Sequence, residues 1–331
     1  MGRYGRSMVR MPYILRRKLL SRKRLRGIPV VQVIFVSSLL LFLSFFAVLL
    51  PSSITPSFAA NGSEVSGIIS QNTTWTLAGN PYIVTGNIVV NSGMTLTIEA
   101  GVEVRFDSGK ALQINGELIA RGNAGNNIVF TSNKTTPAPG DWGYILFGDT
   151  STDATFDSGG NYVSGSVLQY CKVLYGGANN AGGAIKINSS SPFIDNCRIE
   201  NNASRGIQAG GTVGLRLTNN TVTGNTSSDS GGGGIYVGGT QVTIANNIIS
   251  NNTANAYGNW DGGGGIRVDG QNITISGNTI SENTANGPNF WANGGGGVFF
   301  GSGTTVTIKD NTITKNTSGG FGGGIYEWLS V

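Results

Sequence analysis

The sequence predicts an all-β fold, a parallel β-helix, and two repeated features indicate it. The phrase apolar-x-x-Asn-x-apolar-x-x-Asn occurs five times, and a run of three or four glycines follows four of the copies. Successive copies start 23, 27, 31 and 33 residues apart, a period typical of solenoids rather than of closed domains. The copies begin at Ile194, Leu217, Ile244, Ile275 and Ile308.

Each copy predicts two short strands separated by bends. Apolar positions such as Val242 and Ile244 alternate with smaller or polar ones, which gives a strand one buried face. We expect Asn247 to bend the chain, because asparagine tolerates the left-handed conformation. Side-chain amides at equivalent positions should then stack from coil to coil. The predicted ladders consist of Asn220, Asn247, Asn278 and Asn311, and of Asn225, Asn252, Asn283 and Asn316.

The glycine runs predict places where neighbouring coils approach each other closely. Glycine adopts backbone angles that other residues resist, and it leaves room for an adjacent backbone. A phosphate-binding interpretation is disfavoured, because neither a Lys-Ser/Thr pair nor a helix start follows the runs. The runs lead into Ile235, Ile266, Val298 and Ile325.

The same alternation continues upstream with less regularity. We assign residues 60–135 to an N-terminal cap and first coils, and residues 136–331 to the repeats of the β-helix. The upstream strands are expected around Ile88–Val90, Leu96–Ile98, Val102–Phe106, Leu112–Ile114, Leu118–Ala120 and Ile128–Phe130.

Residues 1–59 form a basic N-terminal region followed by a signal peptide or signal anchor. The run 28–50 is apolar and uncharged, and it is long enough for a hydrophobic helix that enters a membrane. Ser57 and Ala59 place small residues where a signal peptidase cuts. We therefore expect export, with cleavage after Ala59 or with retention of the segment as an anchor.

Charge and composition exclude several classes of function. Ten of the 22 basic residues precede residue 28, so 12 remain against 17 acidic ones, a net charge of −5 for the exported part. A nucleic-acid partner is disfavoured, because phosphate binding needs a basic face. The sequence contains no histidine, which excludes imidazole bases, Ser-His-Asp triads and histidine-containing zinc sites.

Short motifs resemble those of known families. Gly182–Ile185 (GGAI) and Phe193–Asn196 (FIDN) are similar to the paired repeats of the polymorphic outer membrane proteins, which are surface adhesins. Residues 80–325 resemble the right-handed parallel β-helix repeats of the pectin-lyase-like superfamily. The resemblance implies a right-handed helix. It does not fix function, because lyases, hydrolases and adhesins share such repeats. The chain stops soon after the last glycine run, so we also expect a C-terminal truncation.

Two segments carry candidate ligand-binding residues at equivalent repeat positions. Both follow Asn-Thr-Ala and precede four glycines, so their tryptophans should project from the same side of adjacent coils. Aromatic rings beside amide and carboxylate groups suit a sugar-binding surface. The alternative is that the two loops pack on each other. The residues are Tyr257, Trp260 and Asp261 in the first segment, and Phe290 and Trp291 in the second.

An acid-rich loop offers a weak calcium site, the one cofactor the sequence indicates. Asp149, Asp153 and Asp157 could supply oxygen ligands from one loop. Their spacing matches neither an EF-hand nor a nonapeptide calcium repeat, and a solvated loop is the alternative. The resemblance to the pectin-lyase-like superfamily implies that a lyase would pair acidic calcium ligands with an arginine or lysine base, and Arg198, Arg216 and Arg267 are expected on the regular coils near acids. No recognisable catalytic constellation follows from these residues, and the catalytic residues stay unknown.

Cys171 and Cys197 occupy the position where later copies carry the first ladder asparagine. Equivalent residues on adjacent strands lie about 4.8 Å apart, inside the range of Cα separations for a disulfide. The residues therefore form either a disulfide or two buried thiols. A catalytic cysteine is disfavoured, because no histidine could activate it.

These observations predict an exported β-helix at the cell surface or in the medium. We expect the protein to act as a binding or adhesive module whose partner is a polysaccharide or cell-surface glycan. It should contact the membrane through residues 28–50. The alternatives are a polysaccharide lyase or glycoside hydrolase, and a structural stalk.

Overall fold

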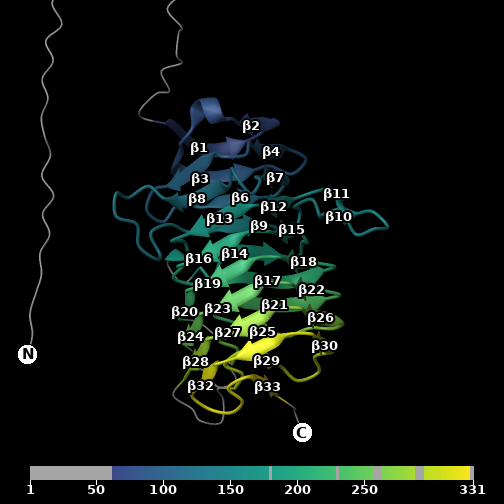
Figure 1. Ribbon diagram of the computed structural model, residues 1–331. Helices are drawn as coiled ribbons and strands as arrows, with labels where there is room; N and C mark the ends of the chain where they lie inside the picture. The colour runs from purple at the N-terminus through teal and green to yellow at the C-terminus, as the bar shows by residue number, and fades with distance from the viewer. Residues whose placement is uncertain (1–61, 179–180, 229–230, 256–261, 288–293, 329–331) are drawn as a thin grey trace, which may run out of the picture. The chain divides into compact units, whose positions relative to one another are not determined.

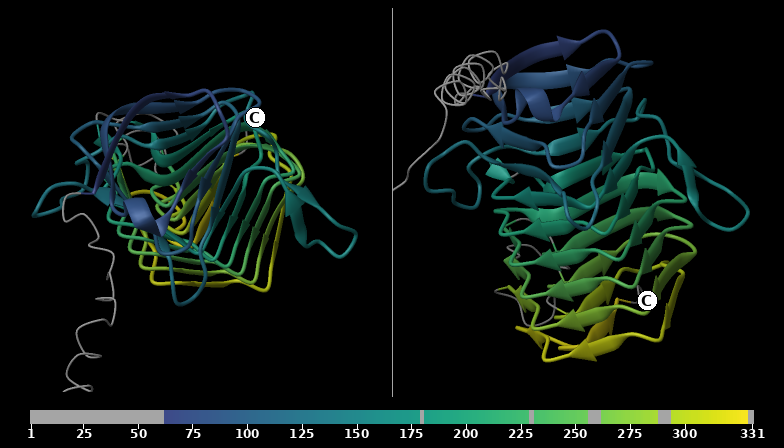
Figure 2. Two further views of the ribbon diagram at one scale, coloured as in Figure 1. Left: turned by 90° about the horizontal axis from the view of Figure 1, so that it is seen from above. Right: turned by 45° about the horizontal axis from the view of Figure 1, so that its top comes forward.

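The computed structural model describes residues 62–178, 181–228, 231–255, 262–287 and 294–328. They form a stack of coils in which strands of successive turns pair in parallel (Figures 1 and 2). Among these residues, none forms a helix with the length and hydrophobicity that a membrane crossing needs. The hydrophobic segment 28–50 and the cleavage site lie outside them.

One wall of the coil is a nine-stranded sheet. Its strands have alternating inward and outward residues, as the sequence predicts. The strands are β2 (Thr73–Trp75), β4 (Thr95–Ile98), β7 (Glu117–Arg121), β12 (Val167–Gln169), β15 (Phe193–Asp195), β18 (Arg216–Thr218), β22 (Thr243–Ala245), β26 (Ile273–Ser276) and β30 (Val306–Lys309).

An 18-stranded sheet supplies two further walls, which we call the first and second series. The two series meet at β3, whose two halves pair with β5 and β6. The sheet begins with β1 (Ser63–Ile69) and β3 (Tyr82–Val90). The first series is β5 (Glu103–Phe106), β8 (Ile128–Ser132), β13 (Cys171–Leu174), β16 (Arg198–Glu200), β19 (Thr221–Thr223), β23 (Ile248–Ser250), β27 (Thr279–Ser281) and β31 (Thr312–Thr314). The second series is β6 (Leu112–Ile114), β9 (Ile145–Phe147), β14 (Gly183–Asn188), β17 (Arg205–Val213), β21 (Ile235–Thr240), β25 (Ile266–Val268), β29 (Val298–Phe300) and β33 (Ile325–Glu327).

The remaining elements are smaller. A four-stranded parallel sheet is formed by strands that, in chain order, follow the first series and precede the glycine runs. It contains β20 (Thr226–Ser227), β24 (Thr253–Asn255), β28 (Thr284–Asn286) and β32 (Thr317–Ser318). A 3-10 helix, η1, spans Leu77–Gly79, and an antiparallel hairpin joins β10 (Thr155–Phe156) to β11 (Tyr162–Ser164).

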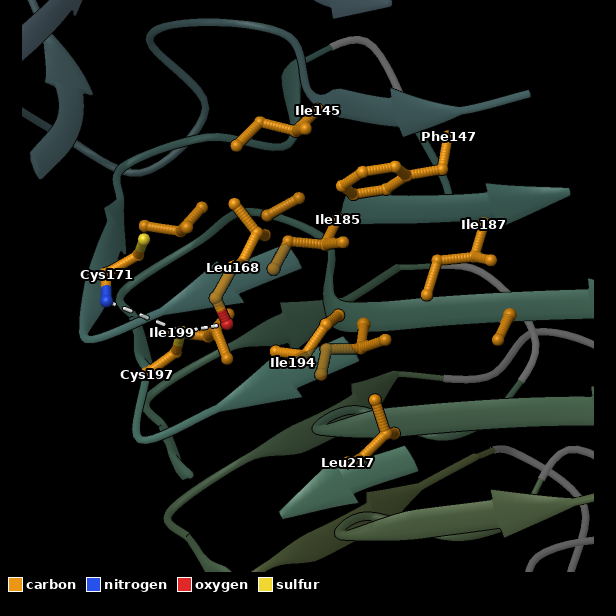
Figure 3. Packing of buried hydrophobic residues seen from close by; sticks show 14 of the residues in the cluster. Ile145, Phe147, Leu168, Cys171, Ile185, Ile187, Ile194, Cys197, Ile199 and Leu217 are labelled. Carbon is orange, nitrogen blue, oxygen red and sulfur yellow. Dashed lines mark hydrogen bonds between the residues drawn. The ribbon is translucent and has the colours of Figure 1, made fainter. Parts of the chain in front are cut away.

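The core is one continuous column of apolar side chains along the axis of the coil (Figure 3). Ile194, Leu217, Ile244 and Ile275 occupy one register position of successive strands, and all four are fully buried. Burial of such a side chain contributes about 1.5–3 kcal/mol. The repeat therefore stabilises each coil through its neighbours.

Two ladders of buried asparagines run beside this core. The Asn247 side-chain oxygen accepts hydrogen bonds from the backbone N–H of Asn220 at 2.8 Å and from its amide at 3.0 Å. The Asn247 amide donates in turn to the Asn278 side-chain oxygen at 2.9 Å and to the Leu217 carbonyl at 2.9 Å. The second ladder repeats this pattern and begins one coil earlier than predicted, at Asn202.

The bend itself differs from the prediction by one residue. Asn246, with φ of 58°, has the left-handed conformation, and the next residue, Asn247, does not. The exposed first residue of the bend turns the chain, and this turn directs the second side chain inward, where its amide joins the ladder. At other bends the left-handed residue is Glu282, Asp310 or Lys315.

The glycine runs pack against the outward side chains of the second series. A Cβ on Gly262 would overlap the Phe299 ring and the Gly294 carbonyl of the next coil. The runs also bond to each other, since the N–H of Gly265 donates to the Gly296 carbonyl at 3.1 Å. Close approach between coils is thus the reason for these glycines.

Candidate functional site

The β10–β11 hairpin projects from the wall formed by the nine-stranded sheet (Figures 1 and 2). Asp157 holds its turn, because the carboxylate accepts hydrogen bonds from the Asn161 backbone N–H at 2.8 Å and side-chain amide at 3.0 Å. These bonds, first those of the side chain and then that of the backbone, lower the pKa of Asp157. The turn thereby fixes where the aromatic residues at its two ends lie.

Aromatic rings dock the hairpin onto the sheet. Tyr162 stacks on Phe193 of β15 with ring centroids 6.0 Å apart, and Phe156 meets the same ring edge-on at 5.2 Å. The Arg216 guanidinium lies 3.7 Å from the centroid of the Phe156 ring and donates to the Gly160 carbonyl at 3.2 Å. Such aromatic and cation–π contacts each contribute about 0.5–1.5 kcal/mol.

A chain of polar side chains crosses four strands beneath the hairpin. Arg121, Gln169, Asp195 and Thr218 occupy one register position of β7, β12, β15 and β18. Arg121 donates to the Gln169 side-chain oxygen at 3.1 Å, and the Gln169 amide donates to Asp195 at 2.9 Å. The Thr218 hydroxyl donates to the other oxygen of Asp195 at 2.7 Å.

Asp195 organises this row and has no free acceptor capacity for a substrate proton. The side chains of Asn196 and Asn219 donate to its two oxygens at 2.7 and 2.8 Å, in addition to the bonds from Gln169 and Thr218. Only 5% of the residue is exposed. Four donors compensate the buried charge, so this carboxylate is a structural anchor.

The hairpin and the sheet enclose a cleft of about 440 Å³, the hairpin cleft. Its volume falls in the range of small-ligand sites. Arg121 and Arg216 come from β7 and β18, which are three strand pairings apart, or about 14 Å along the axis. The lining consists of Arg121, Gly160, Asn161, Tyr162, Gln169, Phe193, Asp195, Arg216, Thr218, Asn219 and Asn246.

Tyr162 supplies the cleft with a neutral phenol. Burial and then the nearby Glu117 carboxylate raise the pKa of Tyr162, although Arg121 opposes them. Its hydroxyl donates to the Gly165 carbonyl at 2.5 Å. The phenol therefore stays protonated at neutral pH. The Arg121 guanidinium lies over its ring, 5.2 Å from the centroid.

The predicted ligand-binding residues Tyr257, Trp260, Asp261, Phe290 and Trp291 lie outside the described residues. The residues that flank their two segments are in register. Asn255 of β24 pairs with Asn286 of β28, and their amides bond at 3.1 Å. At the other end, the Gly263 N–H donates to the Gly294 carbonyl at 3.0 Å. Both segments thus leave and rejoin adjacent coils at equivalent positions.

The three calcium candidates have separate surroundings. Asp153 accepts a hydrogen bond from the Ser191 N–H at 2.6 Å, Asp157 holds the hairpin turn, and Asp149 is exposed in a preceding turn. Within the described ranges, no group of three or more cysteine, aspartate or glutamate side chains could hold a metal ion.

The arginines considered for a lyase also have structural partners. Arg267 pairs with Asp269 at 2.9 Å and packs on the rings of Tyr236 and Phe299. Arg198 pairs with Glu200 at 2.8 Å. Arg216 is the one of the three candidates that lines the hairpin cleft.

The family model described as a pectate-lyase like beta helix domain matches residues 67–200. The chain is a right-handed parallel β-helix. The matched region runs from β1 to the end of β16 and includes the hairpin. The solved structure of a mutant of the periplasmic alginate epimerase AlgG shares 9% identity with this β-helix, covering 81% of this chain and 77% of that chain, with a TM-score of 0.34. No curated protein matches the chain.

Proposed function

We propose that the protein is an exported module that binds an acidic polysaccharide in the hairpin cleft. The observation that carries the proposal is the combination of ring faces and guanidinium groups along one open cleft. Tyr162 and Phe193 provide apolar surface for a sugar ring. Arg121 and Arg216 provide charge-assisted donors for carboxylate or sulfate groups, and the amides around them provide partners for hydroxyls.

Binding fits the chemistry of the cleft better than catalysis does. A general acid or base must be free to exchange a proton with the substrate. Asp195 is saturated by four donors, and Tyr162 holds its proton on the Gly165 carbonyl. The described residues that line the cleft can thus bind a ligand, but they include no acid and base that could transfer a proton to or from it.

Two sequence features extend the proposal beyond the cleft. Trp260 and Trp291, at equivalent repeat positions, would form a second sugar-contacting surface. The segment 28–50 would take the β-helix to the cell surface or the medium, and without cleavage it would keep the protein on the membrane. At a cell surface, glycan binding would make the protein an adhesin.

Affinity gel electrophoresis tests the binding site. Polygalacturonate in the gel should retard the protein, neutral dextran should not, and added salt should reduce the retardation. Arg216→Ala should weaken binding by about 10- to 100-fold, because a hydrogen bond to a charged group contributes about 1.5–3 kcal/mol. Arg105→Ala is the matched control, since this half-buried arginine pairs with Glu103 on β5, outside the cleft.

The same gels separate this proposal from its rivals. Equal weakening by Arg105→Ala and Arg216→Ala would reject the hairpin cleft as the site. A fall in polysaccharide chain length during incubation would instead favour a lyase or glycoside hydrolase. If no glycan retards the protein in the gel, the remaining interpretation is that the β-helix is a structural stalk.

A further inference from the structure

Cys171 and Cys197 lie at bends of neighbouring coils (Figure 3). Their position in the coil is the one that the first asparagine ladder occupies from Asn220 onward. The Cys197 N–H donates to the Asn220 side-chain oxygen at 2.9 Å, and the Cys171 N–H donates to the Cys197 Sγ at 3.4 Å. Sulfur thus takes the place that the amide oxygen has in later coils. Both cysteines are free thiols, and each is 1% exposed.

These cysteines belong to the two coils at the centre of the hairpin cleft. Cys171 comes two residues after Gln169, and Cys197 comes two residues after Asp195. Gln169 and Asp195 are opposite each other on β12 and β15, and they form the middle of the polar row. The thiols lie at the bends where these two strands end.

We propose that oxidation joins Cys171 and Cys197 in a disulfide that fixes the spacing and register of the two coils bearing Gln169 and Asp195. The cysteines directly precede the register pair Lys172 and Arg198, so their Cα atoms are about 4.8 Å apart. Disulfides span roughly 4.4–6.8 Å between Cα atoms. The proposal deepens the proposed function, and it rests on that function for the export that exposes the chain to oxidant.

The bond forms by exchange with a disulfide oxidant, such as oxidised glutathione or an oxidoreductase. One cysteine thiolate attacks the oxidant, and the other then attacks the mixed disulfide, so each cysteine loses one proton while the oxidant leaves as two thiols. The cysteines give up only weak S–H contacts, from Cys171 to the Ala120 carbonyl at 3.4 Å and from Cys197 to the Leu168 carbonyl at 3.3 Å.

Burial restricts when this exchange can take place. The thiolate is the reactive form, and burial, followed by the neighbouring Cys197, raises the pKa of Cys171 well above its usual value. The closed coil also keeps exchange partners from both sulfurs. The disulfide therefore forms before the two coils close over the core, and the folded protein then protects it from reductants.

Thiol counting tests the disulfide without any glycan, so its result is independent of the binding proposal. The full chain is refolded from denaturant in a buffer of oxidised and reduced glutathione, then unfolded without reductant and titrated with a thiol reagent. The disulfide predicts that wild type has no free thiol and that Cys171→Ser has one. A wild-type chain with two free thiols would overturn the proposal. Peptide mapping should show one cross-linked pair of peptides, of which one ends at Lys172 and the other at Arg198.

Two further measurements test its consequences. Protein folded with both thiols reduced should react with the oxidant about 100-fold more slowly than the unfolded chain, and equal rates would refute the protection by burial. Amides of β12 and β15 should exchange hydrogen about tenfold more slowly in the oxidised form than in the reduced form. Equal exchange in the two forms would show that the bond does not stabilise the base of the cleft.

Discussion

Replacing one asparagine of the ladder should destabilise the β-helix far more than replacing its neighbour. The Asn247 side chain makes five hydrogen bonds, and Asn247→Ala removes all of them. Loss of the partner of the buried Asn220 N–H costs about 1–3 kcal/mol, and loss of the remaining bonds adds about 1–2 kcal/mol. We therefore expect a loss of about 2–5 kcal/mol.

The adjacent Asn246 provides the matched control. It is exposed and left-handed, so Asn246→Gly should change the free energy of unfolding by less than about 1 kcal/mol. Urea unfolding followed by circular dichroism measures both variants, with the midpoint falling only for Asn247→Ala. If Asn247→Ala unfolds at the wild-type urea midpoint, or if both variants lose the same stability, the hydrogen bonds of the Asn247 side chain do not stabilise the β-helix as we expect.

Three further predictions concern a glycine run, an acid and the tryptophans. Gly262→Ala should cost about 1–3 kcal/mol, because its Cβ overlaps the next coil, whereas Gly210→Ala, with open space around it, should lower the urea midpoint much less. Burial opposes ionisation of Asp141, but hydrogen bonds from a lysine, a backbone N–H and a serine outweigh it and lower the pKa of Asp141 from its usual value. The free energy that these hydrogen bonds contribute is therefore present above the pKa of Asp141 in the unfolded chain, and it is lost as the pH falls through the pKa of Asp141 in the folded protein. Asp141→Asn should make the free energy of unfolding depend less on pH in the acid range. Trp260→Ala and Trp291→Ala should each reduce retardation in polysaccharide gels, and unchanged mobility would assign these residues to packing between the loops.

The sequence predicted the coils well because their signal is local and repeated. Alternation around Ile244 indicates a strand without knowledge of any distant residue, and five copies in phase indicate a stack. The bend was misassigned by one position, from Asn246 to Asn247. Two consecutive asparagines have the same backbone preference, and only the direction of each side chain in the folded coil separates them.

The hairpin cleft was not predicted, because its contacts join residues far apart in the sequence. Phe156 meets Phe193 on another coil, and Arg216 reaches Gly160 across 56 residues. The acids of this loop suggested calcium, and the structure adds that Asp157 accepts hydrogen bonds within the hairpin turn. A signal was present, since the turn sequence Asp-Ser-Gly-Gly-Asn lies between Phe156 and Tyr162 and favours a hairpin.

The two-residue bends keep a constant length while the segments before the glycine runs vary in length. Asn246–Asn247 and Asn251–Asn252 have counterparts of equal length in the following coils, yet successive copies lie 27, 31 and 33 residues apart. Most of the difference in length between these copies falls in the segment before the glycine run. One residue of it falls between Val298 and Ile308, which are ten residues apart where Ile266 and Ile275 are nine. Duplication of a whole coil would add asparagines that find matching partners above and below. The size of this molecule and the loops it displays can therefore change during evolution without a new solution for its interior.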